Sequence, residues 1–323
     1  MVIESSVSVI INAYNEEDNI SDCLDSLVEQ TYDDFELVVI DDGSTDDTVE
    51  IVESYIDKFQ LKIYKVPHVG LRKSRRIGFS KAKGEILVNI DADEVLREDF
   101  LHNIVKPFKI DEEIGGVGGM VIADGSSWAA EAYGVWNEIF FELRVRGEEV
   151  DWIEGGCSAF RREAYEEIGG FTKNKISSDK DISWRLKDSG WKLISKKDVV
   201  AYQKEPSTFS SVIKREHKHG RKEFYLLKRH EDKMSWKELT RFYPFFGLLV
   251  LGLSLLYVPL LLLVLTGAFV TYLGVFYLVR KYVEDAKLGT SVKSWVIFTF
   301  INLAWSIGYF KSALGIKSEG FEV

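Results

Sequence analysis

The sequence predicts an α/β protein in which helices cover both faces of a mostly parallel sheet, followed by helices that enter a membrane. Two observations predict this fold class. β-rich runs alternate with segments of helical apolar spacing over residues 7–90, as they do in parallel sheets. Farther along, residues 243–279 form a run of 37 residues without one charged side chain, whereas the helices of soluble proteins need a polar face.

Length and composition exclude several classes of protein. The chain has 323 residues, 46% of them hydrophobic, which is too apolar for a disordered chain and too varied for a fibrous one. Its two cysteines, Cys23 and Cys157, cannot form a disulfide framework, so we expect most of the chain in a reducing compartment.

The elements of the soluble part follow in order along the chain. Strands are expected at the short β-rich runs Val7–Ile11, Glu36–Ile40, Leu61–Val66 and Glu85–Ile90. Helices are expected where apolar residues recur at helical spacing, over Glu17–Glu29, around Val49–Tyr55 and over Leu71–Ala82. After Asp93 the alternation becomes irregular, with strands expected at Val117–Ile122 and Val199–Gln203 and a helix over Ser178–Ser189.

Polar residues follow three of these strands at the point where each strand ends. The segments are Asn12–Glu16, Asp41–Asp42 and Asp91–Asp93. The carboxyl ends of parallel strands meet at one edge of a sheet, and ligands of such proteins bind there. The sequence therefore predicts a binding site at this edge.

Asp91 and Asp93 are the candidate metal ligands. Alternate residues of a strand point to the same side, so both carboxylates lie on one side of the strand end. Two oxygen ligands that leave further positions open suit Mg²⁺ or Mn²⁺ bridged to a diphosphate. The alternative is a solvated acidic turn, but the position directly after an apolar strand favours the metal site.

Other polar residues suggest how a nucleotide sugar and an acceptor would be handled. Tyr14 can stack on a base, and Asp42 can accept a hydrogen bond from a base or a ribose. A hydroxyl group that attacks the sugar benefits from a general base, and the candidate is Asp179 at the start of its helix. The alternative role for Asp179 is that of a helix cap.

Charge is unevenly distributed along the chain. Residues 1–213 carry 25 Lys and Arg against 42 Asp and Glu, whereas residues 214–241 carry 10 against 5. An acidic body makes nucleic acid a poor partner, and the short basic stretch suits anionic lipid. This stretch could be an interfacial helix, with Phe224, Leu226 and Leu227 toward lipid. Its cations would then face the phosphates of a lipid-carried acceptor, at Lys214, Arg215, Lys218 and Arg221. The alternative is an ordinary solvated charged helix.

The uncharged run is too long for one membrane crossing. As a single helix it would extend about 55 Å, whereas the hydrocarbon core is about 30 Å thick. We therefore expect a hairpin of two short crossings over residues 243–279, with both ends cytoplasmic because Lys and Arg flank the run. A third apolar stretch, residues 294–310, either crosses the membrane or lies re-entrant at its surface.

Several stretches of the chain carry a resemblance to a known family. They read VSVIINAYNEEDNISDCLDSLVEQTYDDFELVVIDDGSTDDT, GEILVNIDADEVL, and GGCSAFRREAYEEIGGF followed by SSDKDISWRLKDSGW. In this order they resemble the inverting glycosyltransferases of family 2, which have the GT-A fold, over about residues 5–205. The tail, with VIKREHKHGRKEFYLLKRH and NLAWSIGYFKSALG, is similar to membrane-bound members of the succinoglycan-synthesis type.

The resemblance implies roles for individual residues. The donor-binding residues are Ala13, Tyr14, Glu16, Asp42 and Arg75, with Asp41 at the same strand end. Asp93, helped by Asp91, holds the Mn²⁺ or Mg²⁺ ion, and Asp179 is the catalytic base. We expect Gly155 and Gly156 to let the backbone pass close to the sugar or the acceptor. The chain departs from the family pattern at Asn12, Arg76 and Ser178, where Pro, Asn and Glu are usual.

These observations predict three regions and one activity. The regions are a cytoplasmic GT-A domain over residues 1–213, a basic interfacial segment over 214–241 and a multi-pass region of the cell membrane over 242–323. No secretory signal precedes Val7, which agrees with a cytoplasmic domain. The activity is transfer of a single sugar from a UDP- or GDP-sugar to a lipid-linked glycan, because residues 205–245 lack the Gln-x-x-Arg-Trp motif of processive synthases. The alternatives are a polyprenyl-phosphate sugar synthase, a nucleotidyltransferase and an inactive membrane scaffold with this fold.

Overall fold

The computed structural model describes residues 7–124, 127–145, 149–172, 178–204, 208–233, 258–282 and 288–316. They form two compact units, each of which is considered by itself. The first unit contains the described residues of 1–122, 144–173 and 178–204, and the second contains those of 123–143 and 205–323. Residues 123–143 and the described residues of 205–213 thus belong to the second unit, and the predicted division at residues 213 and 241 stays a prediction.

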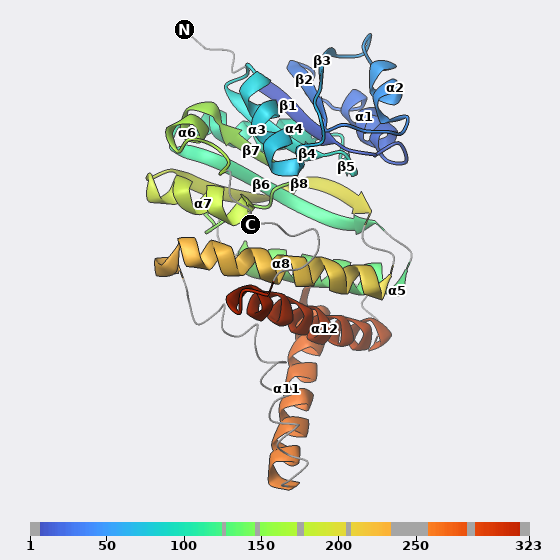
Figure 1. Cartoon of the computed structure of the whole chain (residues 1–323), viewed down its shortest axis with the longest axis vertical. Helices are drawn as coiled ribbons and strands as arrows, with labels where there is room; N and C mark the ends of the chain where they lie inside the picture. The colour runs from blue at the N-terminus through green and yellow to red at the C-terminus, as the bar shows by residue number, and fades with distance from the viewer. Residues whose placement is uncertain are drawn as a thin grey trace. The chain divides into compact units, whose positions relative to one another are not determined.

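One eight-stranded sheet organises the first unit, in the order β3-β2-β1-β4-β7-β6-β8-β5 (Figure 1). Its strands are β1 (Val7–Ala13), β2 (Phe35–Asp41), β3 (Gln60–Lys65), β4 (Ile86–Asp91), β5 (Glu94–Leu96), β6 (Ile114–Asp124), β7 (Ser158–Arg161) and β8 (Lys192–Lys204). β1 pairs in parallel with β2 and β4, and β2 pairs in parallel with β3. Antiparallel pairing begins at β7. The mostly parallel α/β fold predicted from the sequence is confirmed.

Six helices belong to this unit. They are α1 (Ile20–Val28), α2 (Thr48–Glu53), α3 (Leu71–Lys81), α4 (Phe100–Ile110), α6 (Arg162–Glu167) and α7 (Ser178–Asp188). One helix lies between each two successive strands from β1 to β4. Such a helical crossover is what a parallel connection needs, so these four strands can run in parallel. The expected alternation over residues 7–90 is confirmed.

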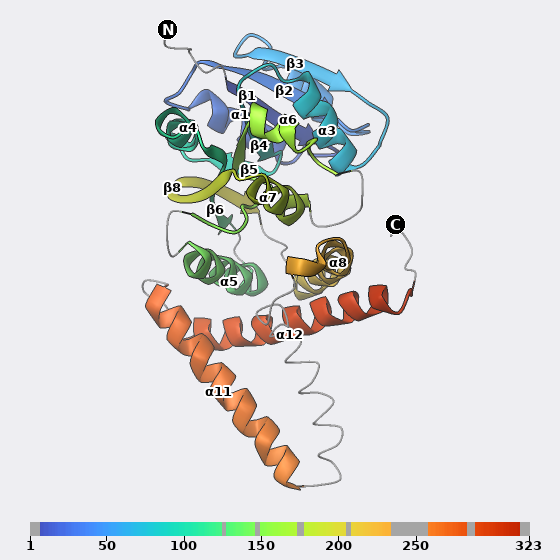
Figure 2. The ribbon, with the colours of Figure 1, turned by 90° about the vertical axis from the view of Figure 1, so that its left-hand side faces the viewer.

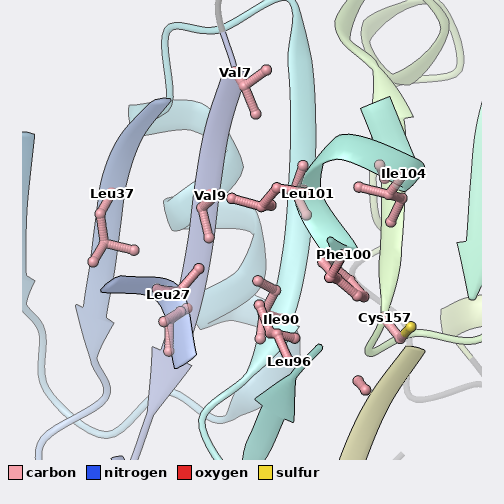
Figure 3. Packing of buried hydrophobic residues seen from close by; sticks show 14 of the residues in the cluster. Val7, Val9, Leu27, Leu37, Ile90, Leu96, Phe100, Leu101, Ile104 and Cys157 are labelled. Carbon is pink, nitrogen blue, oxygen red and sulfur yellow. The ribbon is translucent and has the colours of Figure 1, made fainter. Parts of the chain in front are cut away.

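Two apolar clusters hold these helices on the sheet. Val9 of β1 packs in the cluster that includes Leu27 of α1 and Phe100 of α4 (Figure 3), whereas Ile10 packs with Phe79 of α3 in the other. Successive residues of a strand point to opposite faces, so a strand covered on both sides is buried along its whole length, as β1 is. Each fully buried side chain of this size stabilises the fold by about 1.5–3 kcal/mol.

The strand register places the predicted polar segments side by side. Ala13 at the end of β1 lies opposite Asp41 of β2, and Asn12 lies opposite Asp91 of β4. Three consecutive strands of the sheet thus end level with one another. The edge at which ligands of parallel sheets bind is therefore lined by the residues that the sequence singled out.

Helices form the second unit. They are α5 (Trp128–Arg144), α8 (Phe209–Arg229), α11 (Val258–Tyr282) and α12 (Leu288–Ala313), with a short 3₁₀ turn η1 (Glu231–Lys233) after α8. α8 begins at a capping box, in which Thr208 and Ser211 bond each other's backbone N–H groups. α5, α11 and α12 share an apolar cluster in which Ile139, Val279 and Phe298 take part.

The structure does not support a multi-pass membrane region. In the described part of the chain, one helix, Val264–Tyr282 within α11, is long and apolar enough to cross a membrane. Residues 243–257, the first half of the predicted hairpin, lie outside the described residues. The stretch 294–310 lies within α12, which packs along α8 and buries Ile297, Asn302 and Trp305. The third membrane crossing, predicted over residues 294–310, is therefore not confirmed.

The apolar face of α8 is also covered by protein. Leu226 is fully buried and Leu227 is 3% exposed, and the ring of Phe224 lies 5.3 Å from that of Tyr309 on α12. The prediction that Leu226 and Leu227 face lipid is wrong. Hydropathy alone does not distinguish lipid from a neighbouring helix as the medium that covers an apolar face.

Candidate active site

Acidic side chains gather where β4 ends and β5 begins. Asp91 closes β4, and Asp93 lies just before β5, where its Oδ1 accepts a hydrogen bond from Nε2 of Gln203 at 3.0 Å. Glu16, from the end of β1, reaches the same place. Burial raises the pKa of Glu16, and the charges of Asp93 and Asp91 add to the rise. The carboxyl ends of β1 and β4 thus share one strongly negative field.

This negative field fits a divalent cation. No group of three or more His, Cys, Asp or Glu side chains suited to a metal ion is found among the described residues. The carboxylates of Asp93 and Asp91 are hard oxygen donors of the kind that Mg²⁺ and Mn²⁺ bind, and these ions commonly take their remaining ligands from substrate phosphates and water. A cation bound here would also relieve the repulsion among the carboxylates.

Glu94 is a buried carboxyl that ties two segments together. Its side chain is 1% exposed, and its Oε2 accepts hydrogen bonds from the backbone N–H of Asp91 at 3.0 Å and from that of Cys157 at 3.3 Å. Burial, followed by the charge of Asp91, raises the pKa of Glu94 well above its usual range. Glu94 therefore fixes the loop that contains Gly155 and Gly156 against the end of β4.

A pH-dependent stability follows from the raised pKa of Glu94. In metal-free protein, the folded state binds the proton of the Glu94 carboxyl more tightly than the unfolded chain does. The stability that protonated Glu94 contributes is therefore present below the ordinary Glu pKa and is lost as pH rises through the pKa of the folded state. Glu94→Gln keeps an acceptor oxygen and cannot ionise. We expect the free energy of unfolding of this variant to exceed that of the wild type increasingly as pH rises. Denaturant titrations of both proteins in EDTA from pH 5 to pH 8 measure the difference, and parallel curves would contradict the prediction.

Arg75 lies between two carboxylates that the sequence separates widely. Arg75 is 4% exposed. Its Nη2 lies 2.5 Å from Oδ1 of Asp91, and its Nη1 lies 3.7 Å from Oδ1 of Asp179. Burial lowers the pKa of Arg75, but the charges of Asp91 and Asp179 outweigh it and raise the pKa. Arg75 thus joins the candidate base at the start of α7 to Asp91, the candidate metal ligand at the end of β4.

Gly155 and Gly156 leave room for these carboxylates. A Cβ on Gly155 would lie 2.6 Å from Cγ of Asp179 and overlap its Oδ1, and one on Gly156 would overlap Oε1 of Glu94 and lie 3.1 Å from Oδ2 of Asp91. The two glycines therefore accommodate the side chains of the site itself. Their close approach to the sugar or the acceptor stays a prediction.

Substituting Gly155 by Ala tests the position of Asp179. The new methyl group meets the end of a partly exposed side chain, which can turn away, so we expect little loss of stability. Displacing the base by about 1 Å is expected to lower kcat about 100-fold. Gly274→Ala is a matched control, because a Cβ there has no neighbour within 4 Å. Steady-state kinetics and thermal unfolding of both variants check this, and an unchanged kcat in Gly155→Ala would contradict it.

An exposed aromatic ring lies at the end of β1. Tyr14 is 42% exposed, and its ring lies 4.1 Å from that of His68, tilted by 30°. Asp42 is 3% exposed, and its two carboxylate oxygens accept the backbone N–H groups of Val69 at 2.7 Å and Gly70 at 2.9 Å. Asp42 thus holds the loop that carries His68 beside Tyr14, in addition to any bond it makes to a nucleotide.

Neighbouring donor-side residues act through their backbones or support loops. Ala13 is buried, and its carbonyl accepts the N–H of Asp42 at 2.8 Å. Oδ1 of Asp41 accepts the N–H of Ser44 at 2.9 Å. Asn15 has a φ of 55°, in the left-handed region that Asn tolerates better than most residues. These bonds fix the loops that follow β1 and β2.

Two neighbours of the site have structural roles. Cys157 is fully buried and has a φ of 42°, and burial together with the charge of Glu94 raises the pKa of its thiol well above the usual range. A neutral buried thiol is not a nucleophile. Asp181 is fully buried and binds Arg185 at 2.8 Å, which leaves Asp179 as the carboxylate of α7 that lies beside Arg75.

The predicted acceptor cations belong to the second unit. Lys214 and Lys218 are exposed on α8, whereas Arg215 lies 4.3 Å over the ring of Tyr133. Arg221 is 2% exposed, and its Nη2 donates to the carbonyl of Ile316 at 3.0 Å. The four residues therefore do not form one surface.

Sequence reasoning missed Glu94, His68 and Gln203. Glu94 directly follows the Asp-Ala-Asp segment, and a third acid at this place was a possible sign of a functional residue. Its importance depends on its burial, which the sequence does not show. His68 and Gln203 come from segments that the sequence does not connect with Tyr14 or Asp93.

The sheet and its acidic edge place the chain among α/β proteins of the GT-A type. The family model described as Glycosyl transferase family 2 matches residues 8–169. A probable glycosyltransferase, YdaM of Bacillus subtilis, is 27% identical over 216 residues, or 63% of this chain and 51% of that protein. The poly-beta-1,6-N-acetyl-D-glucosamine synthase of Staphylococcus epidermidis is 23% identical over 214 residues, or 64% and 52%. The chain thus spans about half the length of these curated relatives.

A solved structure confirms the fold. The mannosyltransferase PcManGT from Pyrobaculum calidifontis, determined in complex with GDP-Man and Mn²⁺, superposes with a TM-score of 0.66 at 22% identity and covers 98% of this chain and 89% of its own. The matching family model covers half of the chain. The chain belongs to glycosyl transferase family 2.

Proposed function

We propose that the chain transfers a single sugar, with inversion, from a nucleotide diphosphate sugar to a lipid-linked glycan. The observation that carries this proposal is the position of Arg75, within 4 Å of both Asp91 and Asp179. In a direct displacement, one group stabilises the leaving diphosphate and a base activates the acceptor. Both must lie close together in one small site. Two carboxylates joined by one guanidinium meet that need.

The donor would lie across the ends of β1, β2 and β4. The base would stack on Tyr14, and the diphosphate would extend toward Asp93 and Arg75. A divalent cation held by Asp93 and Asp91 would neutralise charge on the leaving diphosphate when bound. The mannosyltransferase of the same fold, which holds GDP-Man and Mn²⁺, supports such a donor and cation.

The acceptor would be activated by Asp179. This carboxylate is 32% exposed at its side chain, so an acceptor hydroxyl can reach it. Asp179 would take the hydroxyl proton as the acceptor oxygen forms its bond to the anomeric carbon, while the bond from that carbon to the diphosphate oxygen breaks. The products are an inverted glycoside and a nucleoside diphosphate, and the proton stays on Asp179 until solvent removes it.

A membrane-bound acceptor agrees with α11. The window Val264–Tyr282 is 11% buried within the protein, and Leu265, Phe269 and Val270 are each more than half exposed. Exposed apolar side chains in this number indicate contact with a membrane or with another protein, and a helix of this length is sufficient to span a bilayer. We propose that this helix anchors the enzyme where a lipid-linked acceptor is found.

A donor screen in detergent tests the proposal. Purified full-length protein is incubated with UDP- and GDP-sugars, with Mn²⁺ or with EDTA, and the released nucleotide is identified. Cation-dependent release of a nucleoside diphosphate is expected, together with a higher Mn²⁺ requirement in Asp93→Asn. Release of pyrophosphate would indicate a nucleotidyltransferase. Failure to bind any of these donors with Mn²⁺ present would indicate a scaffold without activity.

A further inference from the structure

One backbone segment, residues 153–158, contacts the first turn of α7 at two points. Oγ of Ser183 accepts the backbone N–H of Ile153 at 3.2 Å and donates to the carbonyl of Asp179 at 2.6 Å. Gly155 lies against the carboxylate of Asp179, since a Cβ there would be 2.6 Å from its Cγ. α7 itself packs on the face of the sheet that α3 also covers (Figure 2). The place of this segment therefore sets where the side chain of Asp179 lies.

Two side chains hold this segment on the sheet by bonding the same carbonyl. Nδ2 of Asn89 donates to the carbonyl of Gly155, and Oγ of Ser158 donates to it at 2.9 Å. Asn89 of β4 lies opposite Ser158 of β7 in the antiparallel register, and both residues are fully buried. The segment is thus tied to two adjacent strands at Gly155.

Asn89 is an unusual residue for the interior of this strand. The other buried residues of β4, from Ile86 to Ile90, are apolar, and burying an amide is costly unless its polar atoms are bonded. Oδ1 of Asn89 is buried and has no hydrogen-bond partner among the described residues. An apolar residue would suit the packing better, so the bond from Nδ2 to Gly155 is the feature that distinguishes Asn89.

We propose that Asn89 is a positioning residue for sugar transfer. By fixing the carbonyl of Gly155, it fixes the backbone against which the carboxylate of Asp179 lies, and hence the approach of Asp179 to Arg75. Asn89 and Asp91 are two residues apart on β4, so they point to the same face. One strand thus carries both a candidate metal ligand and the side chain that places the base. The inference rests on the proposed function in one respect, the role of Asp179 as the base.

Replacing Asn89 by Leu tests the proposal, because Leu has a similar size and shape but no N–H group in its side chain. The variant loses one hydrogen bond together with one buried acceptor that has no partner, and Ser158 still bonds the carbonyl of Gly155. We therefore expect the melting temperature to change little. A small displacement of Asp179 is expected to lower kcat about tenfold, with the KM for the donor unchanged. Release of UDP from UDP-GlcNAc or of GDP from GDP-Man by the full-length protein in detergent measures turnover, and an unchanged kcat would overturn the proposal.

Asn103→Leu is the matched control. Nδ2 of Asn103 on α4 also donates to a backbone carbonyl, that of Asp198, at 2.9 Å, and neither residue contributes to the site. We expect this variant to lose the same kind of bond and to keep the wild-type kcat. A loss of kcat as large as that in Asn89→Leu would show that the effect is not specific to Asn89, and it would overturn the proposal.

A double-mutant cycle with Asp179→Asn separates positioning from a general structural effect. If Asn89 acts through Asp179, Asn89→Leu should lower kcat little further in the Asp179→Asn background, because residues that act as a unit are not additive. The same fold loss in both backgrounds would overturn the proposal. Wild-type turnover in Asp179→Asn would reject the base and, with it, the positioning of that base. A large loss in Asp179→Asn beside a wild-type kcat in Asn89→Leu would reject the positioning role alone.

Hydrogen exchange tests the structural step without a donor. If Asn89 holds the segment, the backbone amides of residues 153–158 should exchange faster in Asn89→Leu than in the wild type, because local opening requires less free energy. Asn103→Leu should leave these rates unchanged. Mass spectrometry of peptides that cover the segment measures the exchange. Equal protection in Asn89→Leu and the wild type would overturn the proposal whatever the kinetics show.

Discussion

Replacing Asp179 by Asn is expected to lower kcat by about 10²–10⁴-fold while the KM for the donor changes little. The amide keeps the shape of the side chain beside Arg75 and Gly155 but cannot take a proton, and a positioned general base contributes a factor of this size. Steady-state kinetics with donor and acceptor both saturating measure the loss. Near wild-type turnover would reject Asp179 as the base, and it would favour an acceptor that is already anionic, such as a polyprenyl phosphate.

Asp181→Asn is the matched control for this experiment. Asp181 lies two residues farther along α7, is fully buried and holds Arg185. Removing the charge of the buried Asp181 leaves the partly exposed Arg185 with a weaker partner, which is expected to cost less than about 3–5 kcal/mol, the cost of breaking a fully buried pair. The folded fraction should keep its kcat. The two substitutions thus separate a chemical role from a structural one on a single helix.

The parallel sheet could be predicted because burial on both faces leaves a direct mark on the sequence. β1, β2 and β4 are runs of apolar residues, and they end in polar residues because the sheet register brings those ends to one open edge. Asp91 and Asp93 were therefore recognisable from their place after a strand. In each of these strands, burial on both faces is the cause of the apolar run, and the exposed strand end is the cause of the polar residues that follow it.

Other features depend on contacts that leave no local pattern. The approach of Arg75 to Asp179 joins α3 to α7, and no periodicity within either helix indicates it. In the sequence, Glu94 is one more acid of a polar turn. Its burial results from contacts with Gly156 and Cys157, which are distant in the chain. α12 is apolar enough to resemble a membrane helix, yet it buries Trp305 and Gly308 against α8 because glycines allow close contact between the two backbones.

Replacing Arg75 by Met is expected to lower kcat/KM about 10²–10³-fold, the size of effect seen when one fixed donor to a developing charge is lost. The guanidinium bonds Asp91 and lies 3.7 Å from Asp179, and the Met side chain fills a similar space without a charge. Arg75→Lys is expected to recover only part of the loss, because an ammonium group lacks the planar fork that reaches two carboxylates. Wild-type kcat/KM in Arg75→Met would contradict the expectation.

A double-mutant cycle decides how Arg75 acts. If the guanidinium serves mainly to hold Asp179 in place, Arg75→Met should cost much less in an Asp179→Asn background than in the wild type, because residues that act as a unit are not additive. If it serves mainly to bind the diphosphate, the two losses should multiply, and the affinity for UDP or GDP should fall in both backgrounds. The short bond to Asp91 together with the longer approach to Asp179 leads us to expect the first result, with nucleotide affinity changed less than kcat.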